Sequence, residues 1–174
     1  MSQRRAHFLL VLIFLSWLAP AIAQPLWNWD EDARWQLQRP ETGSSPFQLG
    51  QLISDFGIQE GDQEMVILPQ GILVRHRDRR AVNLTVLEGS WSLLRNDVIV
   101  GKTGGDLASW QANLGQPRAI YVNPEKVAEI HYYRASLADM GLMVAGGTVH
   151  SVMLVEPGYL LPALERTGYL EKKS

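Results

Sequence analysis

Residues 119–155 read AIYVNPEKVAEIHYYRASLADMGLMVAGGTVHSVMLV, and this run predicts an antiparallel sheet. Its apolar and β-branched segments are short, and turn-forming pairs separate them, first Asn123-Pro124 and later Gly146-Gly147. A Gly-Gly pair between two such segments favours a two-residue hairpin loop, because glycine readily adopts the positive φ angles of that turn. The predicted strands cover 119–122, 127–133, 142–145 and 148–155.

Short strands are also predicted upstream, where apolar runs alternate with glycine, proline or charged residues. They cover 65–68, 72–74, 82–87, 91–94 and 98–100. Because Glu88-Gly89 and Asn96-Asp97 are tight turn signals, we expect the last three to pair as consecutive antiparallel neighbours.

Short helices are expected at several places with an apolar face. The segments are 31–38, 47–56, 106–113 and a terminal helix that carries Leu160, Leu161 and Leu164. Asp106 is a suitable N-cap for the third of them, because its carboxylate can accept from a free backbone N–H of the first turn. The fold class that follows is α+β, with predominantly short antiparallel strands in a sheet or partly open small barrel and three or four short helices.

The first 23 residues predict a cleavable secretory signal. Arg4 and Arg5 form its basic start, and the apolar run that follows covers residues 8–18. The small residues of Ala21-Ile22-Ala23 then suit a signal peptidase, so we expect cleavage after Ala23 and a periplasmic or secreted protein. A membrane anchor is the alternative, but the run is shorter than the roughly 20 residues that span hydrocarbon. We therefore expect no stable membrane span after cleavage.

The remaining chain divides by composition into two parts. Residues 24–46 form a predicted tryptophan-rich acidic arm with a linker, and residues 47–174 a single α+β globular domain. The sequence contains no cysteine, which excludes thiol nucleophiles and means that an exported protein must be stabilised by burial rather than by disulfides.

The arm contains three indoles within nine residues, Trp27, Trp29 and Trp35, beside several acidic side chains. Each indole has a large apolar face that is costly to leave in water. Two interpretations follow: the tryptophans pack on the sheet of their own domain, or they anchor a partner protein, where tryptophan is a favoured hot-spot residue.

A dense basic cluster lies between two predicted strands and consists of Arg75, Arg77, Arg79 and Arg80. It could bind an anionic polymer, a lipid headgroup or an acidic partner surface, or it could be a charged hairpin tip that keeps a sheet edge soluble. The formal net charge of the chain is −2, and few aromatic residues accompany the arginines, so nucleic acid is not an expected partner.

Candidates for catalysis are few. His131 and His150 fall on strands that we expect to be neighbours, and Glu129 shares a strand face with His131, so a site of two histidines and a carboxylate is conceivable. No histidine spacing is typical of a metal site, and Gly101-Lys102-Thr103 lacks the earlier glycine of a phosphate-binding loop. We therefore expect neither a metal nor another cofactor.

These observations favour a non-enzymatic binding or assembly module of the bacterial envelope. The expected partner is another envelope protein, contacted through the tryptophan arm or a sheet edge. The alternative is a periplasmic hydrolase that acts on a cell-wall or sugar substrate with His131, His150 and a carboxylate. Nothing in the sequence specifies the oligomeric state.

Overall fold

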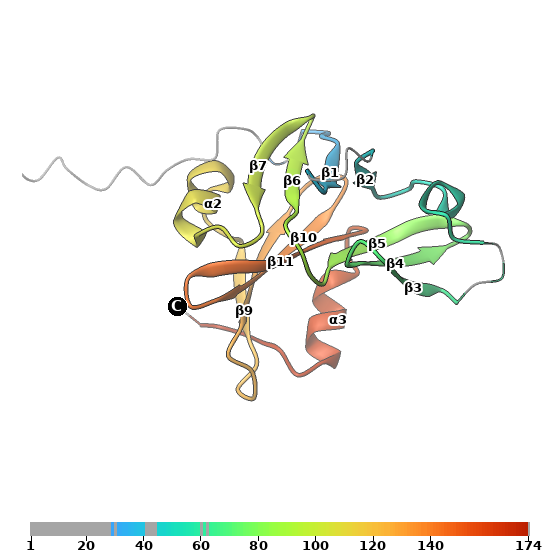
Figure 1. Cartoon of the computed structure of the whole chain (residues 1–174). Coiled ribbons are helices and arrows are strands. Elements are labelled where there is room, and N and C mark those ends of the chain that lie inside the picture. The colour runs from blue at the N-terminus through green and yellow to red at the C-terminus, as the bar shows by residue number, and fades with distance from the viewer. Residues whose placement is uncertain (1–28, 30, 41–44, 60, 62, 174) are drawn as a thin grey trace, which may run out of the picture.

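A computed structural model describes residue 29 and residues 31–40, 45–59, 61 and 63–173 (Figure 1). The predicted signal peptide and Trp27 lie outside these residues. Within them, no helix combines the length and apolarity needed to cross a membrane.

The described residues form two antiparallel sheets, and the larger has eight strands in the order β12-β8-β9-β10-β11-β5-β4-β3. These strands are β3 Met65–Leu68, β4 Ile72–Arg77, β5 Arg80–Val86, β8 Ala119–Val122, β9 Glu129–Arg134, β10 Asp139–Ala145, β11 Thr148–Val155 and β12 Leu170–Glu171. The strands predicted within 119–155 are confirmed, and so is the Gly146-Gly147 hairpin, whose glycines have φ angles of 56° and 77°.

In the smaller sheet, the part of the chain that the structure describes contributes four strands in the order β2-β1-β6-β7. These strands are β1 Trp35–Gln38, β2 Phe47–Gln48, β6 Ser92–Arg95 and β7 Val98–Lys102. The predicted pairing of the strands at 91–94 and 98–100 is confirmed, because β6 and β7 are antiparallel neighbours. The predicted pairing of the strand at 82–87 with the one at 91–94 is wrong, because β5 stays in the large sheet. The chain changes sheets after Val86, where Leu87 and Glu88 donate their backbone N–H groups to the Gly71 carbonyl instead of continuing the ladder.

Three layers result, with the small sheet on one face of the large sheet and α3 on the other (Figure 1). The main core lies between the two sheets and contains Leu37 and Leu93 from the small sheet and Leu84, Met140 and Val152 from the large one. Alternate residues of the same strands face the other way, as the period of two requires. There Ile130, Tyr132 and Val155 pack with Leu160 and Leu164 of the helix.

The described residues contain two α-helices, α2 Leu107–Leu114 and α3 Leu160–Arg166, and one 3₁₀ turn, η1 Ile53–Phe56. The strand-dominated α+β class is thus confirmed, but the expectation of three or four helices is wrong. Asp106 does cap α2, and its side chain accepts from the Ser109 N–H at 2.8 Å.

Two predicted helices are replaced by other structure. In 31–38, Trp35–Gln38 forms β1 and pairs with β6. A strand places Trp35 and Leu37 on one face, where both are buried in the core, whereas a helix would place residues two apart on nearly opposite faces. In 47–56, Gly50 has a φ of 77° and donates to the Ala81 carbonyl, which turns the chain before a helix can form.

A tryptophan truncation tests how far the segment before residue 47 contributes to this core. Trp35→Ala removes an indole that is only 5% exposed, and such a loss costs about 3–5 kcal/mol. We expect the melting temperature to fall by roughly 6–20 °C, as monitored by circular dichroism. Val127→Ala is the control, because that side chain is 92% exposed and should change stability by less than about 0.5 kcal/mol. Equal melting temperatures for the two variants would contradict the packing described here.

Candidate functional site

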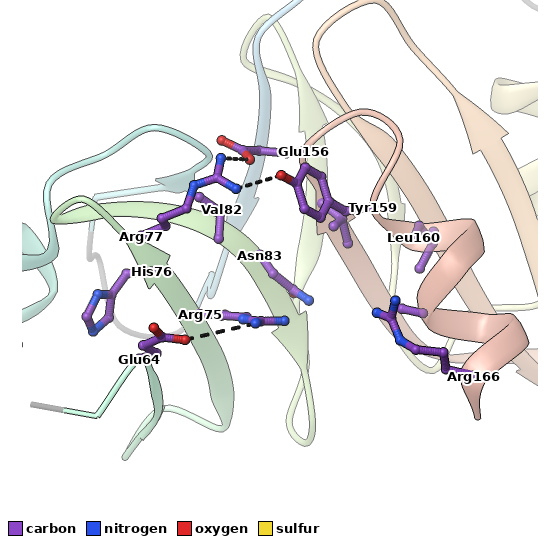
Figure 2. Close-up of a pocket in the computed structure, with 12 residues that line it drawn as sticks. Glu64, Arg75, His76, Arg77, Val82, Asn83, Glu156, Tyr159, Leu160 and Arg166 are labelled. Carbon is purple, nitrogen blue, oxygen red and sulfur yellow. Dashed lines mark hydrogen bonds and ion pairs between the residues drawn. The ribbon is translucent and has the colours of Figure 1, made fainter.

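A concave site lies between α3 and the strands β4 and β5, and we call it the arginine pocket (Figure 2). Its volume is about 280 Å³. Its lining combines polar and charged side chains with an apolar floor, and comprises Glu64, Arg75, His76, Arg77, Val82, Asn83, Val155, Glu156, Tyr159, Leu160, Ala163 and Arg166.

A β-bulge shapes the strand wall of the arginine pocket. Arg75 is paired with Asn83, but the next residue, His76, is paired with Ala81, so Val82 has no partner across the ladder. An extra residue of this kind bends its strand and turns its side chain away from the regular alternation. Val82 and Asn83 consequently both reach the same pocket, although neighbours on a regular strand would face opposite sides.

Arg77 connects the β4–β5 hairpin to the chain that leads into α3. Its guanidinium donates to the Tyr159 hydroxyl at 2.7 Å and to the Glu156 carboxylate at 2.6 Å (Figure 2). The same group lies 5.3 Å from the centre of the Tyr159 ring. These contacts raise the pKa of Arg77 above its usual value, the hydrogen bond to Tyr159 first and the charge of Glu156 second. Arg77 is therefore occupied by protein groups and acts mainly to hold the two walls together.

Arg75 and Arg166 are left with little neutralisation. Among the described residues, Arg75 has one ion pair, with the Glu64 carboxylate at 4.0 Å, and the Glu64 side chain is 81% exposed, so water screens the pair strongly. Within the described part of the chain, Arg166 has no ion pair or hydrogen bond from its side chain. Figure 2 shows the two guanidiniums extending into the pocket from opposite walls, one from β4 and the other from α3.

The floor between these guanidiniums is apolar. Val155, Leu160 and Ala163 contribute hydrocarbon, and the first two are buried. Planar guanidiniums match carboxylate and phosphate oxygens in a two-point geometry. The arrangement therefore suits a ligand that has an anionic head and an apolar body.

The basic cluster that the sequence singled out is divided by the hairpin turn. Arg75 and Arg77 line the pocket, whereas Arg79 and Arg80 do not. Arg79 has a φ of 64° and, with Asp78 at 50°, forms the two-residue turn itself. Arg80 donates to the Gly50 carbonyl at 2.7 Å.

No pattern in the sequence points to Tyr159 or Arg166, although both line the pocket. The terminal helix was predicted only from its apolar face, and Arg166 lies far along the chain from Arg75. The sequence offers only a weak clue: Arg166 lies in the last turn of a short helix, where the helix dipole already favours a basic residue that has no other role.

The histidines considered for catalysis do not converge. β10 separates β9, which carries His131, from β11, which carries His150, so the expectation that they lie on neighbouring strands is wrong. His131 is 3% exposed and contacts Glu129 at 3.3 Å, while His150 is exposed at a bulge beside the Ala145 carbonyl. Neither histidine lines the arginine pocket.

Glu129 is part of a small charge cluster. It accepts from the Lys172 ammonium at 2.7 Å, and this bond, together with the contact to His131, lowers the pKa of Glu129. Burial lowers the pKa of His131, and the nearby carboxylate opposes that shift only in part. The His131 Nδ1 atom is buried and has no partner among the described residues, which favours the neutral tautomer whose Nε2–H donates to Glu129.

The tryptophans that the structure describes pack inward. Trp29 stacks on Trp35 at 5.4 Å between ring centres and on Tyr133 at 5.5 Å. Of the two interpretations of the arm, these two indoles therefore follow the first, packing on their own domain. Across the described ranges, no group of three or more His, Cys, Asp or Glu side chains is placed to hold a metal ion.

The chain matches no protein-family model, no curated protein and no solved structure. Inferences about function consequently depend on the geometry of the site.

A pH series tests the environment of His131. Because its pKa is lower in the folded protein than in the unfolded chain, the unfolded chain binds more protons below about pH 7. The free energy of unfolding should therefore decrease as the pH falls from 7.5 to 5.5, by at most about 1.4 kcal/mol per pH unit from this residue. Urea titrations should show a shallower pH dependence in His131→Gln than in the wild type. Identical slopes in the wild type and His131→Gln would disprove this account.

Proposed function

We propose that this protein is an exported, non-enzymatic binding module of the bacterial envelope and that it recognises its ligand through the arginine pocket. The observation that carries the proposal is the pair Arg75 and Arg166, which extend from opposite walls over an apolar floor with little carboxylate to neutralise them. A guanidinium that faces a concave site without a strong partner can donate to a ligand without first breaking a strong ion pair.

The design of the pocket supports binding rather than turnover. Arg77, Glu156 and Tyr159 bond to one another and hold β4 against the chain entering α3, so they fix the shape of the pocket. His131 and His150, the candidates for hydrolysis, do not line the pocket and lie on two strands separated by β10. A preformed site with a few polar groups and an apolar floor is typical of ligand-binding pockets.

A small probe with one carboxylate and one apolar body tests this function. We expect 3-phenylpropanoate to shift the NMR signals of pocket residues, with little effect from 3-phenylpropanamide, which has the same body without the charge. Arg75→Gln and Arg166→Gln should each weaken binding by roughly 10-fold or more, since hydrogen bonds to charged groups contribute about 1.5–3 kcal/mol. Arg134→Gln is the matched control, because this arginine is exposed on β9 and does not line the pocket. Equal binding of acid and amide, or no shifts in the pocket, would refute the proposal.

Export is the second part of the proposal and is supported by the order of basic, apolar and small residues in 1–23. We expect mass spectrometry of the native protein, recovered from a fractionated cell, to find Gln24 as the first residue in the envelope or secreted fraction. Replacing Ala21 and Ala23 by bulky residues should leave the precursor uncleaved. A native protein that retains Met1 or Ser2 in the cytosolic fraction would refute export without affecting the pocket.

A further inference from the structure

The arginine pocket continues into two further hollows. A neighbouring depression of about 380 Å³ shares Glu156 and Tyr159 with it. A third, of about 300 Å³, shares Leu49 and Leu137 with the second. Each hollow shares two lining residues with the next, so the three lie in a row on the surface. We call this row the groove, and it extends from Arg166 past Tyr159 and Leu137 to Asp32.

The chemistry changes along this groove. The end at Arg75 and Arg166 is positive. The middle is lined mainly by apolar groups, and two of its side chains, Leu137 and Tyr159, are 55% and 52% exposed although large and hydrophobic. At the far end Asp32 is exposed and lines the last hollow beside Arg34, whose guanidinium is already paired with Asp97. The far end is therefore the place where a positive group on a ligand would be favoured.

We propose that the groove binds the carboxyl-terminal segment of a partner protein in an extended conformation. The terminal carboxylate lies between Arg75 and Arg166, and the last side chain contacts Leu160 and Ala163. The preceding residues follow the groove over Tyr159 and Leu137, and a lysine or arginine upstream approaches Asp32. This inference rests on the proposed function, because it assigns a ligand class to the same pocket.

The order of charges supports this occupant. A peptide C-terminus supplies a carboxylate at its very end, which suits a positive site at one end of a groove, and the rest of the segment is elongated, which suits three hollows in a row. Capture of a terminal carboxylate by a few fixed donors is a recurrent mode of peptide recognition. A compact anion would fill the arginine pocket but would leave Leu137 uncovered.

Two peptide pools provide the test. One is a random decapeptide pool with free carboxyl termini, and the other is the same pool amidated at the C-terminus. Each is incubated with the immobilised native protein, and the retained peptides are sequenced by mass spectrometry. We expect at least tenfold greater retention from the free-acid pool, with an apolar last residue and a basic residue several positions before it.

Variants assign the two ends of the groove. Arg75→Gln and Arg166→Gln should abolish retention, whereas Arg134→Gln should not. Arg75→Lys, which keeps the charge but loses the planar fork, should retain peptides more weakly. Asp32→Asn should keep the preference for an apolar C-terminus and lose the preference for a basic residue upstream. The melting temperature of each variant, measured in parallel, identifies any that fails to fold.

The results separate this inference from the proposed function. If neither pool is retained but 3-phenylpropanoate still binds in the pocket, the pocket is a small-ligand site and the peptide proposal is wrong. If the amidated pool is retained equally well, the carboxylate assignment is wrong. If neither peptides nor 3-phenylpropanoate bind, both proposals fail.

Discussion

The pairing of β5 with β11 is the interaction on which the rest of this structure depends. Three residue pairs, Asn83 with Val155, Leu84 with Leu154 and Thr85 with Met153, join a hairpin from the first half of the chain to a meander from the second. This register also determines the pocket. It places Asn83 beside Val155 and Arg75 one strand further out, at a side of the sheet that α3 covers only in part. A shift by one residue would turn the pocket face of β4 and β5 toward the main core.

Local sequence patterns predicted most strands, because the turns and caps that bound a strand or helix depend on residues close in sequence. The Gly146-Gly147 loop and the Asp106 cap are examples in which neighbouring residues alone determine the backbone. The prediction of a helix over 47–56 was wrong because a contact with a residue distant in sequence determines the backbone there. Its apolar spacing suits a helix, but Gly50 bonds to Ala81 in a distant strand, and this tertiary contact overrides the local preference.

The candidate site was predictable only in part, since its two weakly neutralised guanidiniums, those of Arg75 and Arg166, come from different elements. Arg75 belongs to a run with four arginines within six residues, which is easily recognised in the sequence. Arg166 has no such neighbours in sequence. The bulge at Val82 likewise cannot be predicted from the alternation of apolar and polar residues, because it arises from how β4 and β5 pair rather than from either strand alone. A sequence pattern can therefore identify a basic hairpin but cannot identify which of its arginines faces a cavity.

The arginines of the pocket have different roles, and these roles explain why the pocket favours a ligand with an anionic part and an apolar part. The Arg77 guanidinium already donates to Glu156 and Tyr159. The positive charge available to a ligand therefore comes from Arg75 and Arg166, which are both exposed. Charges in contact with water are screened over about 8 Å at physiological ionic strength, and an isolated ion gains little from them. Burial of hydrocarbon against Leu160 and Val155 adds about 25 cal/mol per Å² and is not screened by salt. Selectivity therefore requires both contributions at once, an anionic group to satisfy the guanidiniums and an apolar group to cover the floor between them.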